Sequence, residues 1–163
     1  MRRLAIVLSA ILIVVAPAWA EAPLEITWDD MMPEDWLPPM PDFIEHDYFD
    51  MDLMEQLAPD APVVEGLDNQ YVRLPGFIVP LKLEGQKIVE LLLVPYLGAC
   101  IHVPPPPSNQ IVHVRLAEPQ ALEEPEWNAF WMTGRLRTQA KSSELAEASY
   151  TMVADKVEIY EWD

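Results

Sequence analysis

Five β-rich runs follow one another after Tyr71, and they limit the fold of the chain more than any other feature of the sequence. They are rich in Val, Ile, Leu and aromatic residues, and parts of them alternate between apolar and polar side chains, as half-buried strands do. Turn-forming segments such as Glu84-Gly85-Gln86 separate them. The predicted strands are residues 71–81, 87–96, 110–117, 129–139 and 150–162.

We predict a mainly all-β domain over residues 71–163, a small five-stranded OB-like barrel, with a small β-sandwich as the alternative. The first strand should break or bend near Pro75 and Gly76. One short helix is expected in the segment KSSELAEAS before the last strand, capped by Ser142 or Ser143. The OB fold usually carries its helix one strand earlier, so this position fits the fold only in part.

Residues 21–70 differ in character and form an acidic arm rich in Pro and Met. The chain has no Lys or Arg from Glu21 to Val72, while carboxylates and large apolar residues alternate there. Its prolines exclude one long helix, but Asp50 can cap a short one over residues 51–57. Two interpretations stay open: an extended arm whose aromatic residues anchor on the barrel, or a segment that orders on contact with a partner.

The first 20 residues have the pattern of a secretory signal peptide. Arg2 and Arg3 precede an apolar stretch that is too short to span a bilayer, and Ala18-Trp19-Ala20 is a typical cleavage site. We therefore expect a periplasmic protein without a membrane anchor after cleavage. The formal net charge of −17 argues against binding to nucleic acid. A single cysteine also excludes an internal disulfide.

The segment GACIHVPPPPSNQIVHV contains the candidate metal site. Cys100 and His102 share one face if the chain is extended there, and His113 lies on the less apolar face of the third strand. The stiff run Pro104–Pro107 could fold the chain back and bring all three side chains together. A thiolate and two imidazoles suit zinc or copper(I), so Cys100, His102 and His113 are predicted metal ligands, with zinc as the possible ion.

Three other interpretations of this segment remain. Cys100 can be an inert core residue, because free cysteines are often buried. A cysteine nucleophile paired with a histidine is less favoured, since no recognisable motif orients the imidazole. The proline run can also serve as an exposed docking surface for a protein partner.

The stretches YVRLPGFIVPL, ELLLVPYLGACIHVPPPPSNQIVHV, WMTGRLRT and YTMVADKVEIYE resemble a family of exported bacterial proteins, domain-of-unknown-function family 3299. The segment WDDMMP resembles the part of that family that precedes them. The resemblance implies a genomic context near a metal-regulated ABC transporter with an exported metal-binding protein. Cys100 and His102 fall within the shared motif, whereas an aromatic residue is common in the family at the position of His113.

Together these observations predict a non-enzymatic periplasmic accessory protein that binds a transition metal, zinc, and assists a metal-regulated ABC transporter. Its partners would be periplasmic or membrane transporter proteins. The alternative is a protein–protein interaction module without metal, which uses the polyproline loop and the acidic arm.

Overall fold

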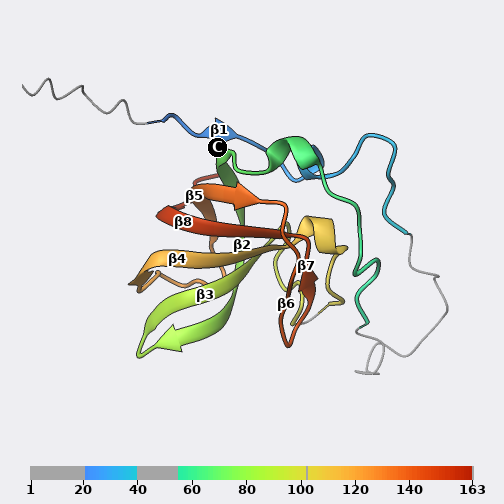
Figure 1. The fold of residues 1–163 in the computed structure, drawn as a ribbon. Coiled ribbons are helices and arrows are strands. Elements are labelled where there is room, and N and C mark those ends of the chain that lie inside the picture. Colours follow the sequence, from blue (N-terminus) through green and yellow to red (C-terminus); the bar gives the residue numbers. More distant parts are fainter. Residues whose placement is uncertain (1–20, 40–54, 102, 163) are drawn as a thin grey trace, which may run out of the picture.

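The computed structural model of the protein describes residues 21–39, 55–101 and 103–162. Five long strands form one sheet that closes on itself (Figure 1). In this part of the chain there is no α-helix, and hence none that is long and apolar enough to cross a membrane. The strands are β1 (Leu24–Glu25), β2 (Tyr71–Glu84), β3 (Lys87–Val94), β4 (Val112–Gln120), β5 (Ala129–Arg137), β6 (Lys141–Ser142), β7 (Glu147–Ala148) and β8 (Tyr150–Ile159), and the 3-10 turns are η1 (Asp29–Met31), η3 (Glu65–Leu67) and η4 (Ser108–Gln110).

The long strands follow the order β2, β3, β4, β8, β5 around the barrel, and β5 returns to β2. Neighbours are antiparallel except β4 and β8, which run parallel with His113 opposite Thr151. The last strand therefore lies between β4 and β5, which is the Greek-key arrangement of an OB-like barrel. The predicted all-β, five-stranded barrel is confirmed.

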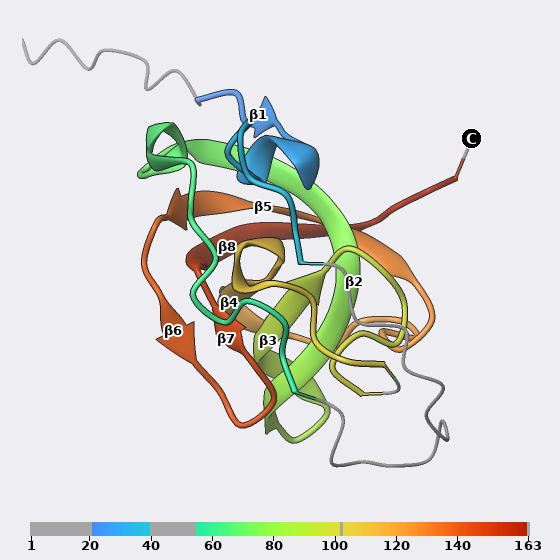
Figure 2. The same ribbon diagram turned by 90° about the vertical axis from the view of Figure 1, so that its right-hand side faces the viewer.

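Strand β2 closes the barrel because it pairs with two strands in turn. Its first half, Tyr71–Phe77, pairs with β5, and its second half, from Phe77 to Glu84, pairs with β3. The strand curves around the barrel as it changes partner (Figure 2). Gly76 lies at the changeover, where a Cβ atom would come within 2.8 Å of the carbonyl oxygen of Val94. The expected bend is therefore right, and the alternative of a break is wrong.

The interior of the barrel is an apolar core. Val112, Val114 and Leu116 of β4 are at most 2 % exposed and face inward, as their alternation predicts. Each fully buried side chain of this size stabilises the fold by about 1.5–3 kcal/mol relative to an exposed one. The other strands contribute Val72, Leu74, Ile78, Ile88, Leu91, Leu93, Phe130, Met132, Leu136, Tyr150, Met152 and Ala154.

The helix expected in the segment 141–149 is absent, and a small hairpin of β6 and β7 stands in its place. Ser143 does accept hydrogen bonds from nearby backbone N–H groups, those of Leu145 and Ala146, but these bonds close a turn. The side chains of Ala146 and Ala148, two residues apart, both point into an apolar cluster, as alternate residues of a strand do. A helix of this length has little stability of its own, so packing decides the conformation.

The described parts of the arm lie against the barrel. The indole N–H of Trp28 donates to the carbonyl oxygen of Pro75 at 2.8 Å, and Met31 is completely buried in the core. Strand β1 pairs with Val72 and Arg73 of β2, a part of β2 that does not pair with β3. It thus covers a strand edge that would otherwise be free. Most of the helix predicted for residues 51–57 lies outside the described residues, and the described residues 55–57 are not helical.

A buried hydrogen-bond network joins the arm to the turn η4. The hydroxyl oxygen of Ser108 accepts from the backbone N–H of Ala61 at 2.9 Å, and the side-chain amide of Asn109 donates to the carbonyl oxygen of Pro62. The hydroxyl group of Ser149 lies 2.7 Å from that of Ser108. Because all three side chains are less than 9 % exposed, each bond replaces water that these groups have lost.

Tyr150 extends the network to two arm segments. Its hydroxyl group accepts from the backbone N–H of Val64 at 2.7 Å and donates to the carbonyl oxygen of Met31 at 2.9 Å. The ring itself is fully buried in the core. One side chain of β8 therefore fixes both described parts of the arm.

We expect Tyr150→Phe to lower the free energy of unfolding by about 1–3 kcal/mol, because two arm backbone groups would lose their buried partner. Urea denaturation measures the loss, and amide exchange at Val64 should become faster. The control is Tyr71→Phe, which removes an exposed hydroxyl that bonds to Asp155 and should cost less than about 0.5 kcal/mol. Equal losses in the two variants would contradict the role assigned to Tyr150.

Candidate functional site

The outer face of β2 and β3 carries a second apolar cluster, separate from the barrel core. The loop 95–111 and the β6–β7 hairpin cover it, so this part of the sheet is buried on both faces. Cys100 belongs to this cluster, and its side chain packs with the aliphatic groups around it. The other members are Val79, Leu92, Val94, Ala99, Ile111, Ala146 and Ala148.

Cys100 is held in a tight turn rather than in an extended segment. Its φ of 65° lies in the left-handed region, which costs a non-glycine residue about 1–2 kcal/mol. The backbone N–H groups of Ile101 and Val103 both donate to the carbonyl oxygen of Gly98. The residue is only 6 % exposed, and burial raises the pKa of its thiol to about 11. The thiol is therefore protonated at neutral pH and is a weak nucleophile.

His113 lies on the outer face of β4, opposite the inward-facing core residues. It is 4 % exposed, more buried than its alternation pattern predicts, because it lies beneath the β6–β7 hairpin. Burial is the main cause that lowers the pKa of His113; the nearby Lys141 ammonium lowers it further, and Glu90 opposes both. The imidazole is thus neutral at pH 7.

Glu90 brings His113 and Lys141 together. One oxygen of its carboxylate, Oε2, lies 3.6 Å from His113 Nε2 and 3.6 Å from Lys141 Nζ. These distances exceed those of good hydrogen bonds, so both nitrogen atoms keep their capacity for another partner. Glu90 was not among the residues selected from the sequence, although it interrupts the apolar run of β3.

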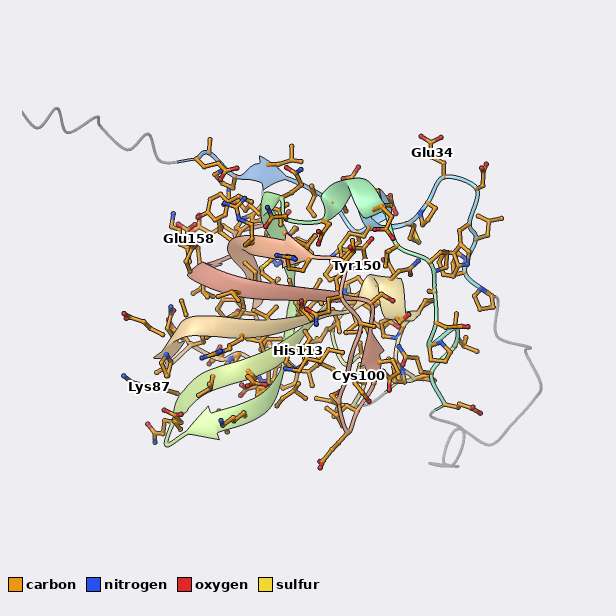
Figure 3. All side chains as sticks on the ribbon, in the orientation of Figure 1. Glu34, Lys87, Cys100, His113, Tyr150 and Glu158 are labelled. Atoms are coloured by element: carbon orange, nitrogen blue, oxygen red, sulfur yellow. The ribbon has the colours of Figure 1, made fainter. Side chains whose placement is uncertain are left out.

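A cleft of about 380 Å³ lies at this group of residues, between the outer face of the barrel and the β6–β7 hairpin. It holds both hydrogen-bond donors and acceptors, beside a few apolar side chains. In Figure 3, the label of His113 lies between that of Lys87, at the start of β3, and that of Cys100, in the loop that follows β3. The lining residues are Pro80, Leu81, Lys82, Glu90, His113, Lys141, Ser142, Ser143, Glu144 and Leu145.

The predicted metal ligands are placed only in part. Cys100 shares its cluster with Ile111, two residues before His113, so the chain does double back as expected. The extended geometry assumed for Cys100 is wrong, because the residue lies in a turn, and His102 lies outside the described residues. Where side chains are described, no three His, Cys, Asp or Glu residues lie close enough to hold one ion. The metal site stays a prediction.

The polyproline run is less accessible than a docking ribbon would be. Pro105 and Pro106 are buried, and the carbonyl oxygen of Pro106 accepts from the side-chain amide of Gln56 in the arm at 2.9 Å. The same amide also bonds to the carbonyl oxygen of Glu147 in β7. The arm therefore contacts the buried middle of the proline run, whereas Pro104 and the residues just before it are accessible.

Four large apolar side chains of the loop before the prolines are exposed. Their relative exposure lies between 40 % and 51 %. We call this group the apolar tip: Tyr96, Leu97, Ile101 and Val103. Sequence reasoning missed it, because a short apolar run followed by prolines resembles the end of a buried strand.

The comparison with known families agrees with this architecture. The model of the DUF3299 family, a protein family of unknown function, matches residues 28–159. The chain belongs to the DUF3299 family. The match begins in the arm and ends with β8, so the shared sequence of DUF3299 proteins includes both the arm and the barrel.

A crystal structure of a DUF3299 family protein from Pseudomonas aeruginosa PAO1 is similar to this one. The two chains are 42 % identical, with a TM-score of 0.75, and the similarity covers 88 % of this chain and 99 % of that chain. No curated protein matches the chain. The family and the fold of this DUF3299 protein therefore have direct support.

We expect Cys100 of the native DUF3299 protein to react with iodoacetamide about a hundredfold more slowly at pH 7 than the same cysteine in urea. The raised pKa leaves little thiolate, and burial restricts access further. Mass spectrometry of timed samples measures both rates. Native labelling as fast as unfolded labelling would show that the thiol is exposed and activated.

Proposed function

We propose that this DUF3299 protein is an exported, non-enzymatic accessory protein that acts by binding another protein through the apolar tip. The observation that carries the proposal is the exposure of four large apolar side chains on one loop. Several exposed apolar side chains within one short loop, from Tyr96 to Val103, are the kind of surface that protein interaction sites use. The signal-peptide pattern of residues 1–20 supports a periplasmic location.

The apolar tip is suited to docking because its loop is restrained. Cys100 packs in the outer apolar cluster and so restrains the loop. Within the loop, Ala99 forms an isolated β-bridge with Val103. A loop that is already ordered loses less conformational entropy when a partner binds. The buried, protonated thiol thus has a structural role in this proposal.

The partner we propose is an exported or membrane component of a transporter. The family context makes this class of protein the first choice. The described arm and the apolar tip differ in chemistry, since the arm is acidic and the tip carries no charged side chain among its four residues. A partner surface with an apolar recess would fit the tip.

Metal handling is the second candidate, with zinc as the ion and Cys100, His102 and His113 as ligands. The return of the loop toward β4 favours it, because Cys100 and Ile111 share one cluster near His113. The neutral state of His113 is also the one that binds a metal. In this case the protein would pass or sense the ion for the same transporter.

For the docking proposal, a photo-crosslinking residue at Leu97 should form an adduct with a transporter component in living cells. The control is the same residue at Val153, a comparably exposed apolar position on β8. Serine at positions 101 and 103 should lower the Leu97 adduct about tenfold, because both apolar contacts would be lost. Equal adducts from Leu97 and Val153, or none with a transporter protein, would refute the proposal.

For the metal candidate, calorimetric titration of chelator-treated protein should show binding of one zinc ion. We expect Cys100→Ser and His102→Ala each to abolish it, since three protein ligands hold the ion. His46→Ala, which changes the remaining histidine of the chain, is the control and should bind zinc normally. Zinc binding that survives the Cys100 change would remove this candidate.

A further inference from the structure

The cleft beside His113 lies where OB-like barrels commonly bind ligands. Such barrels use the outer face of their second and third strands, together with the loops after the first and fourth strands. Here these strands are β3 and β4, and the connection after the fourth long strand, β5, contains the β6–β7 hairpin. The cleft is bounded by β3, β4 and the β6–β7 hairpin, together with residues 80–82 of β2, and it includes no residue of the apolar tip, so it is a separate surface.

The polar groups of the cleft include donors and acceptors side by side. Glu90 offers carboxylate oxygen atoms, whereas Lys141 offers N–H groups 3.6 Å away. Lys82 and Arg115 are in register with Glu90 on either side of it, on β2 and β4. A ligand hydroxyl group can donate to the carboxylate and accept from an ammonium through one oxygen atom, whereas an amide needs separate nitrogen and oxygen atoms for the two bonds.

The positive charges of the chain are distributed unevenly around this face. Lys82 and Arg115 are exposed and form no ion pair with any described residue. The cations on the other side of the barrel each lie within 3.6 Å of a carboxylate: Arg73, Arg135, Arg137 and Lys156. Glu144 also lines the cleft, but Lys82 in the lining and Arg115 beside it outnumber this carboxylate. In a chain with a formal net charge of −17, this local excess of cations favours a ligand that carries negative charge.

We propose that the cleft binds an acidic oligosaccharide, a hydroxyl-rich chain that carries carboxylate groups. The hydroxyl groups of the sugar would bond to Glu90, Lys141 and His113, and its carboxylates would lie near Lys82 and Arg115. Leu81 and Pro80 provide apolar contacts for the sugar ring.

Other polyanions fit this cleft less well. Nucleic acid would meet the strong negative charge of the whole chain. An acidic peptide of Asp and Glu residues has no side-chain hydroxyl groups and could donate to Glu90 only through its backbone N–H groups. The closed barrel also leaves no long free strand edge among the five main strands for an extended peptide to pair with.

Calorimetric titration at low salt, with short oligogalacturonate and oligoglucuronate as probes, tests the proposal. We expect one of these probes to bind, to bind more weakly as salt is added, and to bind at least about tenfold more tightly than a malto-oligosaccharide of equal length. Poly-glutamate of equal charge is the peptide probe. Absence of binding by both acidic sugars, tighter binding of the neutral sugar, or equal binding of poly-glutamate would overturn the proposal.

Two substitutions locate the binding site. Lys141→Gln and Arg115→Gln should each weaken binding of the acidic sugar about tenfold, because each removes a charge-assisted contact. Lys156→Gln removes one positive charge from β8, outside the cleft, and should leave affinity unchanged. Equal losses in all three variants would show a general charge effect and refute the site. Thermal melting checks that each variant is folded.

Discussion

The buried hydrogen bonds between the arm and the turn η4 are the constraint on which the rest of the structure depends. Ser108, Ser149 and Tyr150 satisfy backbone groups of arm residues that would otherwise be buried without partners. The side-chain amide of Gln56 in the arm also bonds to the carbonyl oxygen of Pro106, which is buried. These polar contacts hold the end of the loop that leads into β4, while the packing of Cys100 in the outer apolar cluster restrains the part that carries the apolar tip.

The two faces of the sheet formed by β2, β3 and β4 carry different kinds of side chains. The inner face completes the barrel core, while the outer face carries Cys100 in an apolar cluster and Glu90 with His113 in a polar cleft. A barrel closed by hydrogen bonds on all sides is rigid, so groups on its surface keep fixed positions.

The sequence predicted the parts whose evidence is local. Alternation located the five long strands and assigned Val112, Val114 and Leu116 to the core. The sequence-based prediction failed at residues 141–149. A serine followed by helix-forming residues is typical of a capped helix, but here the Ser143 hydroxyl group accepts hydrogen bonds that close a turn. The prediction also found His113 but missed Glu90 and Lys141, because pairing across strands and hairpins leaves no signal in the spacing of residues along the chain.

What the sequence by itself determined was the β class, the strand count and the acidic character of the arm, since periodicity and composition depend only on neighbours along the chain. The tertiary structure alone decided that the Cys100 thiol is buried, that the middle of the proline run is buried, and that Glu90 faces both His113 and Lys141. These outcomes depend on which segments, distant in the sequence, pack together and exclude water from the side chains between them. That packing exists only after the barrel has closed.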